Sequence, residues 1–452
     1  MLTISQALRR LKGNCADTVP ETLIRQICTD LDYSFRRRIL TPVTTTYLFL
    51  QQVLHGNPAV GELRHRSGLD FTDSAYCQAR ARLPLAFFHR LQRAVTGRCR
   101  HDASADPASR WRGHRLFLLD GSSFSMPDTP ELQEAFGQSG AQAPGCGFPT
   151  AHLLVLFDAH AGFLLHALPA PLRTHDLAHA AVLQHALEPS DVLVGDRAFC
   201  SYAHLALLRQ RHLHGLFRAH QKLLIDFRPY RRHVHPQRAG KEPAGLPRSR
   251  WLRRLGQHDQ LVEYFKPRER PAWLTAGAYA QLPASLVVRE VRFQVRLPGR
   301  RVQSITLVTT LLDPRRYSAG ALARLYARRW QVETDLKSLK ETLGMDVLRC
   351  ETLPGVIKEL LMFVIVYNLV RRVMQEASRH QGVSPERISF VDALRWLRWA
   401  RPGDEVPRLR VNPERPGRVE PRARKRRPKQ YDLLTKPRAE LRKALLHKQR
   451  AA

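Results

Sequence analysis

Four residues between positions 326 and 340 combine side chains that could bind a phosphodiester and a metal ion. Tyr326, Arg329, Glu333 and Lys340 are separated by 3, 4 and 7 residues. On an ideal α-helix these positions fall within about 60° of arc. The helix would then present one carboxylate flanked by two cations and a phenol. The same pattern is typical of a solvated helix face with incidental ion pairs, so the spacing alone leaves both interpretations open.

Two more carboxylates follow strand-like runs upstream. Asp120 ends RLFLLD (115–120) and Asp196 ends DVLVGD (191–196). An Asp at a strand exit is often a turn former, but a carboxylate at the end of a buried strand is costly unless it is paired or ligated. Mg²⁺ prefers oxygen ligands, and two ions about 3.5–4 Å apart can hold the attacking and leaving oxygens of a phosphodiester. We therefore expect Asp120, Asp196 and Glu333 to hold two Mg²⁺ ions, for which Mn²⁺ could substitute.

Other acids close to these positions fit the same role less well. Asp128 lies in the turn-like MPDTP, and Asp158 ends the second predicted strand, whose end is usually farther from the fourth. Asp335 and Glu341 fall away from the helix face that carries the tyrosine, the arginine and the lysine. This pattern favours Glu333 as the third acid.

The elements that would position the acids form an α/β core. Their order is three strands, a helix, a strand, a helix and a fifth strand, at 115–120, 152–158, 162–168, 175–187, 191–196, 202–211 and 213–219. This order is typical of a ribonuclease-H-like domain, in which the first and fourth strands lie side by side. Carboxylates at the ends of those two strands could then share one metal site.

The rest of the chain divides by composition. We expect a helical N-terminal DNA-binding domain, or a helical cap on the core, over 1–110, the first part of the core over 111–220, and the core with its catalytic helix again over 301–350. Between the core parts, 221–300 carries 17 Lys and Arg against six Asp and Glu, which fits a β-rich insertion touching DNA or an irregular solvated loop. C-terminal helices at 351–400 and a flexible basic tail at 401–452 complete the prediction.

The charge balance predicts a polyanionic partner. The chain has 73 Lys and Arg against 40 Asp and Glu, a net charge of +33, and each phosphate neutralised by a cation releases a counterion. The longest apolar run, LLMFVIV at 360–366, is much shorter than the ~20 residues of a membrane-spanning helix. Seven scattered cysteines without a CxxC pair fit a reducing cytoplasm. We expect double-stranded DNA as the partner, in a reducing cytoplasm and away from membranes.

Several ordered stretches resemble one family of enzymes. The pattern Y-x2-R-x3-E-x6-K, the block DGSSFSMPDTPEL (120–132), the block GDRAFCSY (195–202) and the helix VIVYNLVRR (364–372) are similar to DDE transposases of insertion-sequence family 4, a group that forms DNA hairpins. The intervening stretch at 136–165 is also similar. Ser122 replaces the family's Thr after the first Asp-Gly, which leaves the acids intact.

The resemblance implies a metal-dependent DNA transposase that cleaves transposon ends, forms a hairpin and joins the ends to target DNA. It implies an insertion domain between Asp196 and Glu333, and pairing of two ends suggests a homodimer. Arg329 and Lys340 would bind phosphates beside the scissile bond, the arginine as a fork and the lysine as a point charge. Tyr326 would contact a phosphate or pack beside it.

Three assignments stay open at this point. Arg197 would be a further phosphate contact or the ion-pair partner of Asp196. Trp251 and Trp273 could each stack on a flipped base, although core packing is the commoner role. The alternatives to transposition are a metal-dependent nuclease without strand transfer and a catalytically dead DNA-binding regulator derived from a transposase.

Overall fold

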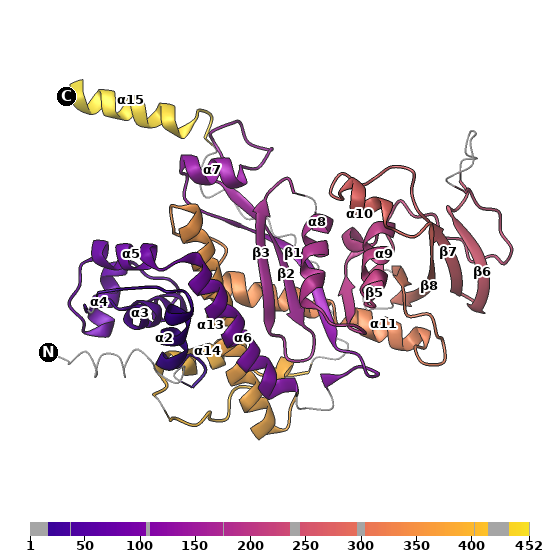
Figure 1. Cartoon of the computed structure of the whole chain (residues 1–452), viewed down its shortest axis with the longest axis horizontal. Coiled ribbons are helices and arrows are strands. Elements are labelled where there is room, and N and C mark those ends of the chain that lie inside the picture. Colours follow the sequence, from indigo (N-terminus) through magenta and orange to yellow (C-terminus); the bar gives the residue numbers. More distant parts are fainter. Residues whose placement is uncertain are drawn as a thin grey trace.

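The computed structural model describes most of the chain. The described residues are 17–36, 38–104, 109–174, 176–235, 245–295, 303–401, 403–414 and 434–451. Figure 1 shows a central sheet, a group of helices around one end of it, a lobe of further strands at the other end, and a projecting C-terminal helix. The predicted helix in SQALRRLKG (5–13) and the basic run RARKRRPK (422–429) lie outside the described residues.

One nine-stranded sheet runs through the molecule in the order β3-β2-β1-β4-β5-β9-β8-β7-β6. β1 pairs antiparallel with β2 and parallel with β4, and β4 pairs parallel with β5. The predicted adjacency of the first and fourth strands is therefore confirmed. The bounds of these strands are Leu116–Ser125 for β1, Thr150–Asp158 for β2, Leu164–Pro171 for β3, Val192–Gly195 for β4 and His214–Arg218 for β5.

Helices lie between the parallel strands in sequence, as parallel pairing requires. α8 (Asp176–Leu183) precedes β4, and α9 (Tyr202–Gln210) connects β4 to β5. Ser201 begins α9 because its side chain accepts a hydrogen bond from the His204 backbone N–H, which caps the helix. Helix α9 packs on β5 and α8 packs on β2, so both cover the central strands.

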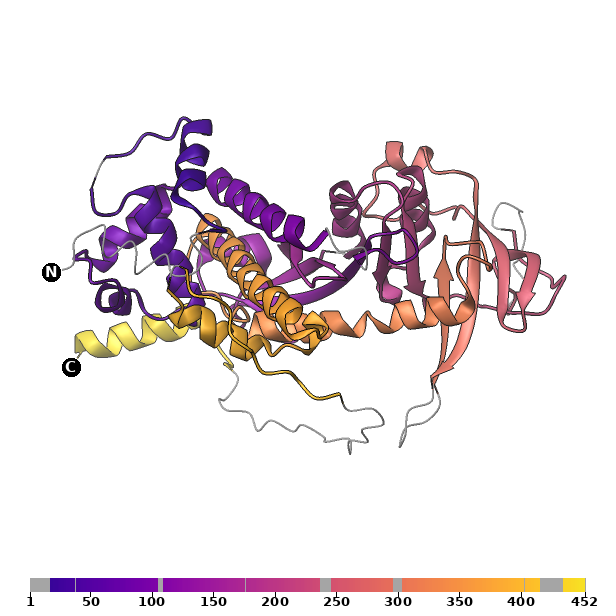
Figure 2. The same cartoon turned by 90° about the horizontal axis from the view of Figure 1, so that it is seen from below.

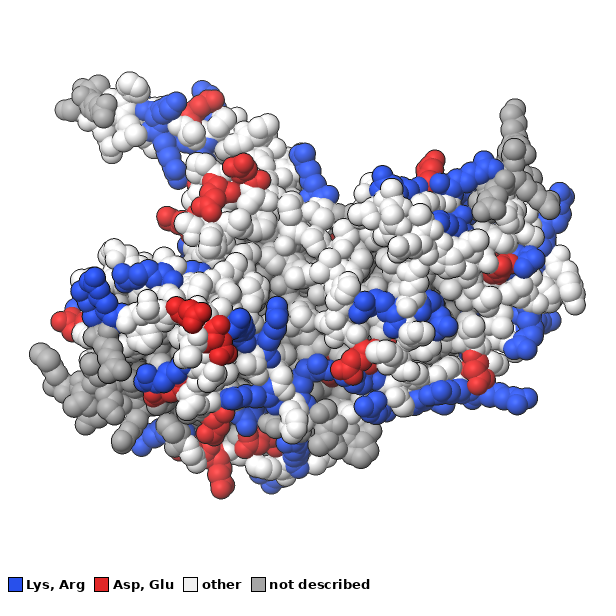
Figure 3. All heavy atoms as spheres, viewed as in Figure 1, with Lys and Arg blue, Asp and Glu red and all other residues white. Residues whose placement is uncertain are grey.

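The lobe at the other end continues the same sheet. Its strands are β6 (Ser249–Gly256), β7 (Asp259–Phe265), β8 (Ser285–Val295) and β9 (Gln303–Thr309), with the short α10 (Ala276–Ala280) before β8. β9 pairs antiparallel with both β5 and β8, so it joins the lobe to the central strands. Lys and Arg side chains line the rim of this lobe, with few acids among them (Figure 3). The segment expected to be β-rich is therefore β-rich, and it extends the central sheet.

The other helices predicted for the N-terminal part, which fall on described residues, are present. They are α2 (Glu21–Asp30), α3 (Pro42–Leu54), α4 (Val60–Ser67), α5 (Asp73–Arg82) and α6 (Leu85–Ser104). The long α13 (Leu353–Gln381) packs against α3, α6 and β3, and α14 (Phe390–Trp399) packs on α13. By length and composition α13 could cross a membrane, but 78% of its most apolar stretch is buried inside the protein. It therefore serves as the core helix that joins the N-terminal helices to the sheet.

The end of the tail differs from the prediction of a flexible arm. Residues 438–451 form the helix α15, which projects from the body (Figure 1). Arg438, its first residue, forms an ion pair with Asp128 at 3.3 Å and lies over the Phe148 ring at 3.9 Å. These contacts fix the start of the helix, which the basic composition of the tail did not indicate.

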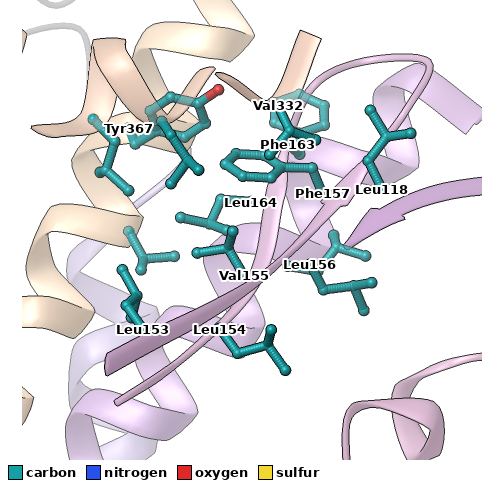
Figure 4. Close-up of a cluster of buried hydrophobic side chains, with 14 of the residues drawn as sticks. Leu118, Leu153, Leu154, Val155, Leu156, Phe157, Phe163, Leu164, Val332 and Tyr367 are labelled. Carbon is teal, nitrogen blue, oxygen red and sulfur yellow. The ribbon is translucent and has the colours of Figure 1, made fainter. Parts of the chain in front are cut away.

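Alternation along β1 decides which way its acid points. Leu118 lies with Val332 and Tyr367 in a buried apolar cluster on one face of the sheet (Figure 4). Side chains two residues apart on a strand share a face, so Asp120 and Ser122 point to the same side as Leu118. This is the face on which the segment after β9 runs toward α13, as the turned view in Figure 2 shows.

Candidate active site

Asp120 lies in the middle of β1 and not at its end as predicted, because residues 121–125 continue the pairing with β2. Its side chain is largely buried. Its carboxylate accepts a hydrogen bond from the Gly121 backbone N–H at 2.9 Å. Burial raises the pKa of Asp120, the Gly121 N–H and the Arg329 guanidinium oppose the rise, and the negative charges of Asp196 and Glu333 add to it. Both of the other predicted acids therefore lie within electrostatic reach of Asp120.

Asp196 follows β4 directly and is positioned by its pairing with β1. Leu119 pairs with Gly195 in the parallel register, so Asp120 and Asp196 occupy the next position on neighbouring strands. Asp196 is half-buried, and within the described part of the chain its carboxylate has no hydrogen bond or ion pair. An unpaired carboxylate beside a second one is the arrangement that a cation would stabilise.

Glu333 comes from a segment that is less regular than predicted. Instead of one helix, the structure has α11 (Ala319–Ala327), α12 (Trp330–Lys337) and a π-helical turn, η5 (Ser338–Thr342). Backbone N–H groups around the α11–α12 junction bond carbonyls three residues back, as in a 3₁₀ turn. The prediction of one regular helix is therefore wrong, since the hydrogen-bond pattern changes between Tyr326 and Val332 and again after Lys337.

Arg329 links two of the three acids. Its guanidinium lies 3.4 Å from Asp120 Oδ2 and 3.1 Å from Glu333 Oε1. It also bonds the Tyr326 hydroxyl, whose pKa burial raises to about 12. The Arg329 side chain is only 10% exposed, and its Nε has no hydrogen-bond partner. The predicted tyrosine, arginine and glutamate therefore meet beside Asp120.

Lys340 reaches β1 from the π-helical turn. Its Nζ donates a hydrogen bond to Ser122 Oγ at 3.1 Å, on the face of β1 that carries Asp120. The chain after the turn also pairs with the end of β1, because the Ser125 N–H bonds the Asp346 carbonyl and the Leu348 N–H bonds the Ser125 carbonyl. This pairing holds Lys340 close to the first acid.

Arg197 is exposed and lies next to Asp196 in sequence. It donates to Gln221 Oε1 at 3.2 Å, and in the described part of the chain it has no ion pair with Asp196. The ion-pair interpretation is therefore excluded in this conformation, while the phosphate contact stays a prediction.

The competing acids have other partners. Asp128 pairs with an arginine of the tail helix, and Asp158 caps the turn between β2 and β3 by accepting two backbone N–H bonds. Asp335 is buried 3.4 Å from the Arg371 guanidinium, while Glu341 lies 3.9 Å from Lys337 on the exposed side. In the described part of the chain, none of these four acids pairs with Arg329, the arginine that contacts Asp120.

Two residues near the acids were not identified from the sequence. Trp330 is 60% exposed and its ring lies 5.1 Å from the Arg329 guanidinium. Arg218, at the end of β5, lies one position beyond the Gly195–Phe217 pair and acts electrostatically on Tyr326. The position of Trp330 directly after Arg329 in the sequence could have identified it as a site residue. Arg218 could not be identified in this way, because only the pairing of β4 with β5 brings it close to the acids.

The two tryptophans predicted as base-stacking candidates lie in the lobe. Trp251 packs against Tyr230 with ring centroids 4.5 Å apart, and its Nε1 is buried without a hydrogen-bond partner. Trp273 is half-buried against the apolar core. Packing is therefore the role that the contacts of both side chains support.

The three acids have the ligand atoms that a divalent cation prefers, but their carboxylates are too far apart in this structure to bind one ion together. Three carboxylates provide the hard oxygen ligands that Mg²⁺ prefers. Across the described ranges, however, no three His, Cys, Asp or Glu side chains lie close enough together to hold a metal ion. For Asp120 and Glu333 the separation has a visible cause, because the Arg329 guanidinium lies between their carboxylates.

Comparison with known proteins gives the family. Residues 111–369 match the family described as Transposase DDE domain. Transposase InsG for insertion sequence element IS4, from Escherichia coli (strain K12), is 26% identical over 384 residues, which cover 80% of this chain and 78% of that protein. InsZ of the same strain, also named a transposase, is 29% identical over 102 residues, 22% of this chain and 34% of that protein.

A solved structure is also similar. The cryo-EM structure of the piggyBac transposase synaptic complex with hairpin DNA matches with a TM-score of 0.41 and 10% identity, over 87% of this chain and 79% of that chain. The family match alone spans more than half of the chain and includes the three acids. It implies dependence on a divalent metal ion and binding to DNA. The chain belongs to the DDE transposases of the IS4 family of insertion sequences, and its activity is that of a DNA transposase.

Proposed function

We propose that Asp120, Asp196 and Glu333 hold two Mg²⁺ ions, with Mn²⁺ able to substitute, and cleave DNA at the transposon ends. The observation that carries the proposal is the parallel pairing of β1 with β4, which brings the first two acids to neighbouring positions. Glu333 joins them through the guanidinium that it shares with Asp120. Divalent ions bound there supply the activation of water and the neutralisation of phosphate charge that this cleavage needs.

The cations around the acids position the DNA backbone. Arg329 and Lys340 bind the phosphates beside the scissile bond, and Tyr326 orients the arginine through its hydroxyl. Arg218 and the exposed Arg197 extend this basic surface past the end of β4. These side chains hold the scissile phosphate over the carboxylates, which supplies the orientation that phosphoryl transfer requires.

Cleavage proceeds through a hairpin in this proposal. Attack by water frees a 3′-hydroxyl at the transposon end. That hydroxyl then attacks the opposite strand, so a new bond to phosphorus forms and the bond to the flanking DNA breaks. A second water then attacks the hairpin phosphodiester, which leaves a 5′-phosphate on one strand and restores the 3′-hydroxyl that joins target DNA. Trp330, exposed beside Arg329, offers a face on which a base displaced from the tight hairpin can stack.

The finer architecture belongs to the same proposal. The strands from β1 to β5 form a ribonuclease-H-like core, 221–300 is an insertion domain, and 1–110 is a DNA-binding domain. Two copies pair the two transposon ends, in the bacterial cytoplasm. The basic rim of the lobe supports its contact with DNA, because Lys and Arg dominate that surface (Figure 3).

Replacing the third acid tests the proposal. Glu333→Gln keeps the shape of the side chain but removes its charge, and cleavage of a plasmid with the cognate ends should fall by about 100-fold or more in Mg²⁺. Binding of the ends should be retained. The matched control is Glu341→Gln, on the same segment but paired with Lys337 on the exposed side.

The products separate the alternative functions. Ends joined to target DNA identify a transposase, cut ends alone identify a nuclease, and binding without cutting identifies a regulator. Normal cleavage by Glu333→Gln would show that Glu333 is not a metal ligand.

A further inference from the structure

Arg329 is placed where a divalent ion would otherwise find its ligands. Its two terminal nitrogens contact one oxygen of Asp120 and one oxygen of Glu333. A guanidinium and a divalent ion both require these oxygens, and two cations in one small space repel each other. The same side chain is also needed for phosphate binding in the proposed function. One arginine therefore faces two competing sets of anions, the carboxylates and the DNA phosphates.

We propose that Arg329 acts as a latch on the acid site. In the DNA-free protein its guanidinium pairs with Asp120 and Glu333 and so blocks metal binding. In the DNA complex the guanidinium binds a phosphate instead, and the two acids become free. Binding of divalent ions then depends on bound DNA. As a result, the protein cannot cleave DNA before it has bound a transposon end. This inference rests on the proposed role of Asp120 and Glu333 as metal ligands.

The geometry of the contacts is that of an exchangeable pair. Arg329 makes one bond to each acid, at 3.4 and 3.1 Å, which is longer than the roughly 2.7–2.9 Å of a strong charge-assisted bond. Arg289 in the lobe shows the contrast, because it holds Asp259 by two bonds of 2.7 and 2.5 Å. A phosphate offers Arg329 the two-point contact that the acids do not provide.

The surroundings of the latch favour a phosphate as the group that releases it. The Arg329 Nε is buried without a hydrogen-bond partner, so a donor remains for an incoming oxygen. Lys340, on the same face, is bonded to the neutral Ser122 hydroxyl and not to an acid. A phosphate between the two cations would gain both of them. The 48% exposure of the Glu333 side chain leaves a route for the guanidinium to turn away from the acids.

The effect on metal binding follows from the population of the open state. When only a fraction of molecules has the acids free, the apparent dissociation constant for the ion increases by the inverse of that fraction. If one molecule in ten is open, removal of the latch tightens binding about ten-fold. DNA acts in the same direction, because it binds the open arrangement.

Titration of the DNA-free chain with Mn²⁺ alone, followed by electron paramagnetic resonance of the free ion, tests the latch. Arg329→Gln should bind Mn²⁺ about ten-fold more tightly than the unsubstituted chain. The matched control is Arg328→Gln, whose guanidinium contacts the Ala159 carbonyl and Glu386. It should leave Mn²⁺ binding unchanged. Because the chain has 20 histidines that could bind Mn²⁺ elsewhere, each titration is repeated with Asp120→Asn, which should remove the gain.

The outcomes separate the latch from the function on which it rests. Equal and weak Mn²⁺ binding by the unsubstituted chain and Arg329→Gln, with Asp120-dependent binding in the DNA complex, would overturn the latch and leave the acid assignment standing. Mn²⁺ binding that Asp120→Asn never changes, with or without DNA, would overturn the acid assignment itself. Circular dichroism melting of each variant confirms that the compared proteins are folded.

Discussion

Replacement of Lys340 by alanine should change how end binding depends on salt. The Lys340 Nζ lies 3.1 Å from Ser122 Oγ, on the face of β1 that carries Asp120, and it has no acid partner in the described part of the chain. If it binds one phosphate, its loss removes one counterion-release event, and the slope of log affinity against log salt decreases by about 0.9.

The expected magnitude follows from that slope. When the salt concentration rises from about 50 to 200 mM, one phosphate contact accounts for roughly a 3.5-fold loss of affinity. Lys340→Ala should therefore bind the ends more weakly at low salt, and its deficit relative to the unsubstituted chain should shrink by roughly 3.5-fold at the higher salt.

Fluorescence anisotropy with a labelled transposon end, at several salt concentrations, measures this change. Lys337→Ala is the matched control, since it removes the same charge from the same segment, but its side chain is 68% exposed and lies 3.9 Å from Glu341. Its slope should equal that of the unsubstituted chain. If Lys340→Ala also keeps the full slope, Lys340 does not contact a phosphate, and the assignment of this helix face to the DNA backbone is wrong.

Two further predictions concern stability. Gly162 has a φ of +70°, and a Cβ there would overlap the Arg371 guanidinium. Gly162→Ala should therefore lower the free energy of unfolding, measured in urea, by roughly 3–5 kcal/mol through loss of a buried ion pair. Gly140→Ala, with open space around it, should change that free energy by less than about 0.5 kcal/mol, and equal effects of the two substitutions would refute the packing argument. Burial lowers the pKa of His204 to about 4, so the protein should lose up to about 3 kcal/mol of stability from this group as the pH falls from 6.5 toward 4. His204→Gln should flatten that dependence in urea unfolding at several pH values, and an unchanged dependence would mean that His204 is not held neutral by burial.

The pairing of β1 with β4 could be predicted because it depends on element order. Three strands, a crossover helix and a fourth strand leave few ways to build a sheet, and the parallel crossover narrows them further. The register Leu118–Val194 and Leu119–Gly195 then brings Asp120 and Asp196 together. The hydrophobic runs did not indicate the length of β1, which continues to Ser125, so the proximity of the two acids follows from strand order and register and not from a shared strand end.

The local part of the acid site was predictable for a similar reason. Tyr326 and Arg329 are three residues apart, and Arg329 and Glu333 are four apart, so any helical turn brings them together. The predicted position of Lys340 on the same helix face depended on a regular helix continuing for seven more residues. The π-helical turn interrupts that helix and changes the direction of the Lys340 side chain. Its contact with Ser122 spans 218 residues of sequence, so periodicity could not indicate it.

Long-range contacts account for the remaining differences. The strands of the lobe were recognisable by alternation, but β9 pairs with both β5 and β8, so the lobe and the core share one sheet. The contact of Arg329 with Asp120 also joins distant parts of the chain. Likewise, the start of α15 is fixed by Asp128 and Phe148, which its basic composition did not reveal.

The position of the metal is the most direct test of the central claim. The complex with transposon-end DNA is loaded with Fe²⁺ in place of Mg²⁺ and treated with hydrogen peroxide, which Fe²⁺ reduces to hydroxyl radicals that cut the polypeptide close to the ion. Mass spectrometry should then find cuts in three separate segments, around Asp120, Asp196 and Glu333, and Asp120→Asn should weaken all three sets together. Cuts confined to one of these segments, or to histidine-rich parts of the surface, would contradict a metal site shared by the three acids.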